Sequence, residues 1–104
     1  IEKIISPPLL ICVTSARSPQ DPFREEEDYA ATACAIQNMA LSLWGNGVGS
    51  QWSTGTITRS DAAYSAIGVS REKEQIVGFI KAGYPEKIPS ITKKAVEEIR
   101  AYLP

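Results

Sequence analysis

Residues 51–55, Gln-Trp-Ser-Thr-Gly, are the stretch whose residue types could most readily do chemistry. Within five uncharged positions they offer backbone N–H groups, two hydroxyls and one large aromatic ring. Such groups suit a flat, uncharged ligand that forms hydrogen bonds, for example an isoalloxazine ring. Composition alone favours a second interpretation, in which the stretch leads from a loop into a strand and Trp52 belongs to the core.

Several classes of active site are excluded by composition. The 104 residues include no histidine, so the chain cannot form a Ser-His-Asp or Cys-His catalytic group. Two cysteines without histidine do not make a zinc site, and no metal site is predicted. The 11 basic and 12 acidic residues give a net charge of −1, which provides no electrostatic reason to expect nucleic acid or an anionic membrane as partner.

Cys12 and Cys34 lie in apolar surroundings without a C-x-x-C spacing. We interpret them as reduced thiols of a cytoplasmic protein rather than as a disulfide. Residues 1–5 lack the pattern of a signal peptide, and the chain does not begin with Met. We therefore expect it to be a piece of a longer polypeptide.

Charge is distributed unevenly, and residues 29–58 carry none. The part from Tyr29 to Trp44 is too short and too rich in Thr, Gln, Asn and Ser to span a bilayer. A helix with no charged face must be surrounded by protein, and 104 residues offer little to surround it with. We expect a partner, or a further segment of the polypeptide, to bury this helix.

The pattern predicts elements in the order β-α-(β)-α-β-α, the strand in parentheses being the weakest signal. Residues 9–13 and 76–80 are apolar runs typical of strands buried on both faces, and Gly78 indicates a close approach or a bulge. Residues 15–24 are predicted as a loop. A first helix is expected from the acidic residues 25–28 to Gly45–Gly47. A second is expected from the Ser60–Asp61 cap to Gly68. A third would begin at a Thr92 cap and carry an apolar stripe of Val96, Ile99 and Leu103. The last helix would carry Lys93–Glu97 and Lys94–Glu98 pairs.

Four blocks in order resemble the FMN-dependent nitroreductase family. They are Asp28–Leu41, Gly47–Gly55 (GVGSQWSTG), Ile67–Val69 and Ile76–Pro85 (IVGFIKAGYP), with residues 8–11 as the first strand. The resemblance covers nearly the whole chain, and compact nitroreductases with a Trp in the loop after the long helix are the most similar. It implies an α+β, nitroreductase-like fold with a long apolar central helix.

The resemblance also implies a homodimer with FMN at the subunit interface. Trp52, Ser53, Thr54 and Gly55 would line one face of the flavin, with a backbone N–H near Thr54 or Gly55 bonded to the reactive ring nitrogen. Lys93, with Lys94, would reach the FMN phosphate, and residues 42–47 would border the nicotinamide. No side chain need act as an acid or base, because the cofactor supplies the chemistry.

The family's N-terminal half, with its Arg-Ser-x-Arg-like phosphate-binding segment, is absent from residues 1–104. We therefore expect the C-terminal part of a single domain, completed by the same or another chain. The implied activity is ping-pong hydride transfer from NAD(P)H through the flavin to nitroaromatic, quinone or similar acceptors. The alternative is a non-catalytic interaction module derived from the same fold, active only with a partner chain if at all.

Overall fold

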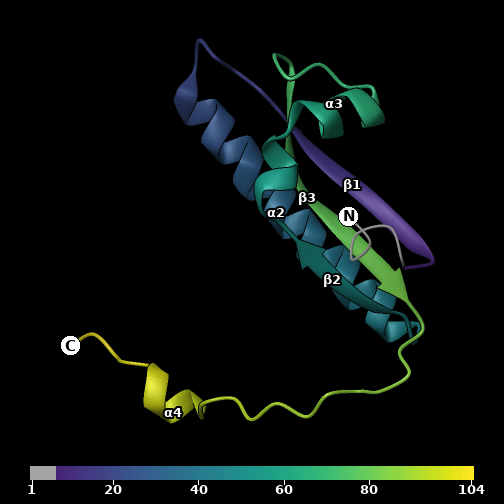
Figure 1. Cartoon of the computed structure of the whole chain (residues 1–104). Helices are drawn as coiled ribbons and strands as arrows, with labels where there is room; N and C mark the ends of the chain where they lie inside the picture. The colour runs from purple at the N-terminus through teal and green to yellow at the C-terminus, as the bar shows by residue number, and fades with distance from the viewer. Residues whose placement is uncertain (1–6) are drawn as a thin grey trace.

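The computed structural model describes residues 7–104 (Figure 1). In chain order the elements are β1 (Leu9–Ala16), α2 (Pro22–Gly45), β2 (Gly49–Ser53), the 3₁₀ helix η1 (Thr56–Arg59), α3 (Asp61–Ile67), β3 (Glu74–Gly83) and α4 (Val96–Ile99). This order confirms the predicted α+β class, including the strand between the first two helices. The interpretation of residues 1–5 lies outside the described residues.

The three strands form one antiparallel sheet in the order β1-β3-β2, so β3 is central. Residues 76–80 of β3 are all buried, which confirms the prediction of a strand covered on both faces. The same prediction for residues 9–13 is wrong, since Leu9 and Leu10 are 49% and 37% exposed. β1 is an edge strand, and the core reaches it only at Ile11, Cys12 and Val13.

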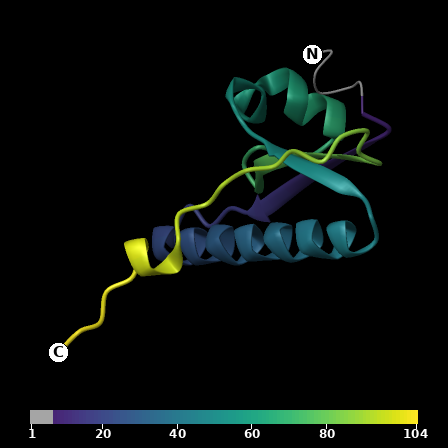
Figure 2. The same cartoon turned by 90° about the horizontal axis from the view of Figure 1, so that it is seen from below.

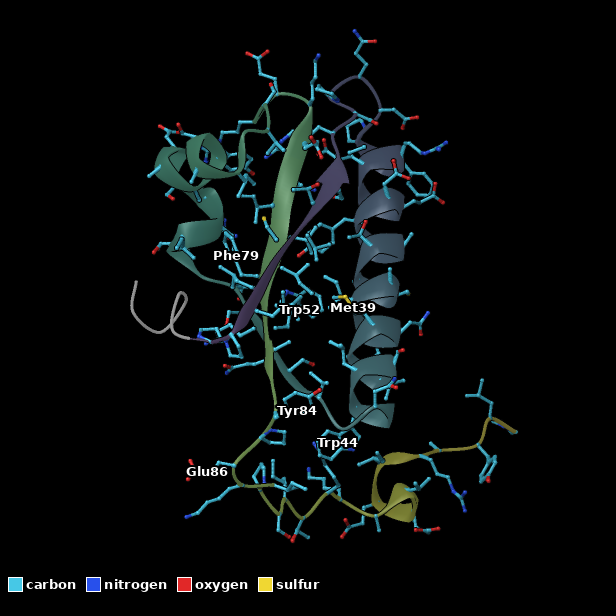
Figure 3. All side chains as sticks on the ribbon, turned by 90° about the vertical axis from the view of Figure 1, so that its right-hand side faces the viewer. Met39, Trp44, Trp52, Phe79, Tyr84 and Glu86 are labelled. Carbon is cyan, nitrogen blue, oxygen red and sulfur yellow. The ribbon has the colours of Figure 1, made fainter. Side chains whose placement is uncertain are left out.

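Helices cover the two faces of the sheet, as Figure 2 shows with α2 on one side and η1 and α3 on the other. On the α2 side, buried Ile36, Val77 and Ile80 pack with Ile11, Val13 and Met39. On the α3 side, buried Ala63, Tyr64, Ile76 and Phe79 pack with Cys12, Ile57, Ile67 and Val69. Figure 3 shows Met39 and Phe79 on these opposite sides of the sheet. The molecule therefore has two small cores separated by β3.

The long helix begins earlier than predicted. Its N-cap is Asp21, whose carboxylate accepts the Arg24 N–H at 3.1 Å, and Pro22 occupies the first turn, where its missing N–H costs nothing. The loop before the helix is correspondingly shorter than residues 15–24, because β1 continues to Ala16. The predicted end is confirmed, since α2 stops at Gly45 and Gly47 has a φ of +77°.

Most of the long helix α2 is not buried by the described residues of this chain. Ile36 is the buried residue of α2, whereas Leu41 and Trp44 are 60% and 49% exposed. The expectation that a partner or a further segment covers the helix therefore stays a prediction.

The predicted short helix is confirmed as α3. The Ser60 hydroxyl accepts the Ala63 N–H at 3.2 Å, and Gly68 closes the helix with a φ of +73°. Tyr64 then fixes α3 to the sheet, because its buried hydroxyl accepts the Ile76 N–H at 2.9 Å.

The predicted C-terminal helix is mostly wrong. Only Val96–Ile99 is helical, Ala95 rather than Thr92 is the N-cap, and both Lys93 and Lys94 precede the helix. The predicted stripe has nothing to pack on, with Leu103 94% exposed, and such short helices depend on tertiary burial. Figure 1 shows the segment after β3 leading away from the sheet. It contributes to a radius of gyration of 16.8 Å, against about 13 Å for a compact chain of this length.

Gly78 lies where β1 and β3 change register. Val13 pairs with Gly78 and Thr14 pairs with Ile76, so Val77 is the extra residue of a β-bulge. The predicted bulge is confirmed.

The predicted close approach at Gly78 is also confirmed. A Cβ at this position would collide with Nε1 and Cδ1 of the Trp52 indole and lie 3.1 Å from the Ser53 carbonyl oxygen. The same Nε1 donates a 3.4 Å hydrogen bond to the Val77 carbonyl. Only glycine therefore lets the Trp52 ring lie against β3.

We predict that Gly78→Ala lowers the free energy of unfolding by about 1–3 kcal/mol through overpacking. In a Trp52→Ala background the same substitution should cost distinctly less, because the colliding ring is gone. Denaturant unfolding of wild type, the two single variants and the double variant measures both costs. Equal costs in the two backgrounds would show that the indole does not require the glycine.

Candidate functional site

A cavity of about 550 Å³ opens where the chain leaves β2, bordered by β3, η1 and the first half of α2. Its wall includes two predicted site residues, Thr54 and Gly55, together with Tyr29 and the arginines Arg17, Arg59 and Arg71. Its size is within the range of pockets that bind small molecules.

The backbone at Thr54 and Gly55 has an unusual conformation. Gly55 has φ +120° and ψ −167°, a conformation that residues with a side chain rarely adopt. Its carbonyl accepts the Thr58 N–H at 3.1 Å and the Thr58 hydroxyl at 2.7 Å. Outside the regular helices and strands, the hydrogen bonds found within residues 7–104 do not use the N–H of Thr54 or Gly55 as donor. Among the described residues, these two N–H groups therefore have no partner in the protein.

Trp52 and Ser53 are placed differently from Thr54 and Gly55. Both belong to β2, where Trp52 pairs with Ile80 and Ser53 with Phe79, and neither lines the cavity. Trp52 is 41% exposed and lies against Gly78, so it is neither a core residue nor a free platform. The interpretation of the stretch as a loop leading into a strand with Trp52 in the core is therefore wrong, because the strand comes first and the loop follows Ser53. The interpretation as a ligand-binding stretch stays a prediction.

The remaining predicted site residues lie elsewhere. Lys93 and Lys94 are exposed residues of the segment after β3, which leads away from the sheet (Figure 1). Within residues 42–47, Trp44 lines a second cavity of about 410 Å³ with Gly49 and Ser50, at the opposite end of β2 from Thr54. Of the predicted site residues in the described chain, Thr54 and Gly55 line the larger cavity, whereas Lys93, Lys94 and residues 42–47 do not.

The three arginines of the larger cavity were not predicted as site residues. Arg17 follows β1, Arg59 ends η1 and Arg71 precedes β3, so only the fold brings them together. The one sequence signal is that Arg59 is the first charged residue after the uncharged block 29–58. Arg71 pairs with Asp61 and donates to the Arg59 carbonyl, with its guanidinium 5.0 Å from the centre of the Tyr64 ring.

Both cysteines are free thiols, Cys12 half-buried and Cys34 exposed. Burial, with a smaller contribution from the carboxylate of Glu74, raises the pKa of the Cys12 thiol. Cys12 therefore stays protonated at neutral pH and is a poor nucleophile.

Within residues 7–104, no three His, Cys, Asp or Glu side chains gather as a metal site would require. No helix in this range is long and apolar enough to cross a membrane.

The model of the family described as "Nitroreductase family" matches residues 2–84, well over half of the sequence. The chain belongs to the nitroreductase family. The relative named "Putative NAD(P)H nitroreductase YfhC" from Bacillus subtilis is 33% identical over 69 residues, which are 66% of this chain and 35% of that protein. "Putative NAD(P)H nitroreductase YdjA" from Escherichia coli is 30% identical over 79 residues, 76% of this chain and 43% of that protein.

Solved structures confirm the nitroreductase-like fold. A nitroreductase-like family protein from Bacillus cereus superposes with a TM-score of 0.80 at 30% identity, covering 94% of this chain and 52% of that one. A Desulfovibrio desulfuricans protein, crystallised in complex with FMN, has the same fold with a TM-score of 0.71 at 20% identity, covering 91% and 54%. This nitroreductase-family chain thus spans about half or less of the lengths of the proteins that it matches.

The Gly55 conformation yields a second prediction. Gly55→Ala should destabilise the protein by about 1–3 kcal/mol, because alanine is strained at this φ even though a Cβ there would meet no atom within 4 Å. Gly45→Ala is the matched control, since its Cβ also meets nothing and its φ is not positive. Thermal unfolding of both variants measures the difference. An equal midpoint for the two would mean that Gly55 is not conformationally required.

Proposed function

We propose that this chain is the C-terminal part of an FMN-dependent oxidoreductase that transfers hydride from NAD(P)H to nitroaromatic, quinone or similar acceptors by a ping-pong mechanism. The observation that carries the proposal is the pair of unused N–H groups at Thr54 and Gly55 on the wall of a cavity, in a chain that belongs to the nitroreductase family. The named relatives and the FMN-bound structural neighbour support it.

FMN, when bound, supplies the hydride chemistry. The residues of this chain have simpler tasks. The N–H of Thr54 or Gly55 would donate to the reactive ring nitrogen, and the absent side chain of Gly55 lets a ring approach the backbone closely. The cavity beside them would hold the substrate ring and exclude water. No step requires a side-chain acid or base, which is compatible with a chain that has no histidine.

The proposal needs protein beyond these residues. We propose a homodimer with FMN at the interface, in which α2 is buried and the N-terminal half comes from the same or another chain. The exposed Leu41 and Trp44 of α2 support this, because apolar side chains of this size gather at interfaces. In that assembly Lys93 and Lys94 would bind the FMN phosphate, supported by the resemblance and by their free side chains. Two free thiols support a cytoplasmic location.

The third prediction separates the backbone N–H of Thr54 from its side chain. Thr54→Pro removes the N–H, whereas Thr54→Ala keeps it and removes only the hydroxyl. In the full-length protein, Thr54→Pro should weaken FMN retention or slow flavin reduction by NADH at least about tenfold, the effect of one lost hydrogen bond. Thr54→Ala should change either by less than about threefold.

Visible absorption after desalting measures FMN retention, stopped-flow spectroscopy measures flavin reduction, and circular dichroism confirms that both variants are folded. A folded Thr54→Pro protein that binds and reduces FMN like wild type would contradict the assignment of this loop. A wild-type protein that refuses added FMN would instead favour the non-catalytic interaction module.

A further inference from the structure

We propose that Arg17 and Arg59, on the wall of the cavity beside Thr54 and Gly55, bind the anionic group of the substrate that exchanges hydride there. The anion is a phosphate or a carboxylate. The inference rests on the proposed function and extends it, because it names what this cavity selects.

The first support is the charge of the wall. Three arginines line the cavity, and no acidic side chain is among its lining residues in the part of the chain that the structure describes. The chain as a whole carries a net charge of −1, so this positive charge is local rather than general. A recess with one sign of charge concentrates ligands of the opposite sign.

The second support is that Arg17 and Arg59 lack a carboxylate partner. The ion pairs found within residues 7–104 are Arg24–Asp28, Arg71–Asp61 and Arg100–Glu97. Glu74 pairs in the sheet with Ala16, the residue before Arg17, but its carboxylate accepts the Thr14 hydroxyl at 2.6 Å instead. Arg17 uses only its Nε, in a weak 3.4 Å hydrogen bond to the Glu74 carbonyl. The remaining guanidinium donors of Arg17 are left for a ligand.

Arg71 has a different task from the other two. Its guanidinium is held by Asp61, by the Arg59 carbonyl and by the Tyr64 ring, and Tyr64 is itself tied to the sheet through the Ile76 N–H. Arg71 therefore fixes the backbone of Arg59 at the end of η1. We assign it as a positioning residue rather than as a ligand of the anion.

The third support is what shares the cavity. Thr54 and Gly55, whose N–H groups have no partner among the described residues, line the same space, and so does Tyr29 from α2. A substrate whose ring meets the flavin at Gly55 would extend its charged group toward the arginines. Guanidinium groups match the planar geometry of carboxylate and phosphate oxygens, with two parallel hydrogen bonds.

The test uses the full-length protein with its flavin and matched substrate pairs. The donor pair is NADH and 1-benzyl-1,4-dihydronicotinamide, which has the same reacting ring without phosphates. The acceptor pair is 4-nitrobenzoate and 4-nitrobenzamide. Stopped-flow measurement of each half-reaction gives an apparent dissociation constant for each compound. The variants are Arg59→Gln, Arg17→Gln and the double variant, with Arg24→Gln as control, since Arg24 is exposed and lines no part of the cavity.

Loss of a charge-assisted hydrogen bond should raise the apparent dissociation constant of the charged member of at least one pair about tenfold or more. The uncharged member should change less than about twofold, and so should both members in Arg24→Gln. An effect confined to NADH identifies the phosphates of the donor, and one confined to 4-nitrobenzoate identifies a carboxylated acceptor. Equal changes for charged and uncharged members in both pairs, or no changes, would overturn the inference.

Calorimetric titration with pyrophosphate and with benzoate separates this inference from the proposed function. If the wild-type protein reduces no flavin with either donor, the proposed function fails. In that case the anion site at Arg17 and Arg59 is upheld by itself if one of these anions binds wild type and Arg24→Gln but not the double variant, and it is overturned if neither anion does so. Arg59 is exposed, so its substitution should leave the fold intact, and the thermal unfolding midpoint verifies this.

Discussion

The packing of the Trp52 indole on Gly78 is the contact on which the rest of the arrangement depends. It joins β2 to the central strand at the β-bulge formed by Val77, where the indole N–H also bonds to the backbone. Trp52 is held there one residue before β2 ends at Ser53, and the cavity-lining residues Thr54 and Gly55 follow directly. The Trp52 indole thus anchors to the central strand the end of β2 that leads into the cavity wall.

A second constraint is that β3 must serve two small cores at once. One of its faces packs on α2 and the other on α3, so the apolar run 76–80 is buried throughout. Much else stays uncovered, including the outer residues of α2 and the segment after β3 (Figure 1). The extended shape and the limited span relative to its relatives both accord with the proposal that further protein completes the domain.

The sequence predicts best where the signal is local. Gly45–Gly47 and the Ser60 cap predicted helix boundaries, because capping depends on a few adjacent residues. Gly78 predicted a close approach, since glycine within an apolar strand has few other reasons to occur. The C-terminal helix failed because its apolar stripe finds no surface within this chain. The arginine wall could not be predicted, because only the folded sheet brings Arg17 near Arg59.

A crystal structure of the full-length protein with FMN bound would test the assignment of the Thr54–Gly55 loop. We expect the reactive ring nitrogen within about 3.2 Å of the backbone N of Thr54 or Gly55, at the cavity that these residues line. A flavin bound at another place, with the Thr54–Gly55 loop facing solvent or other protein, would contradict it.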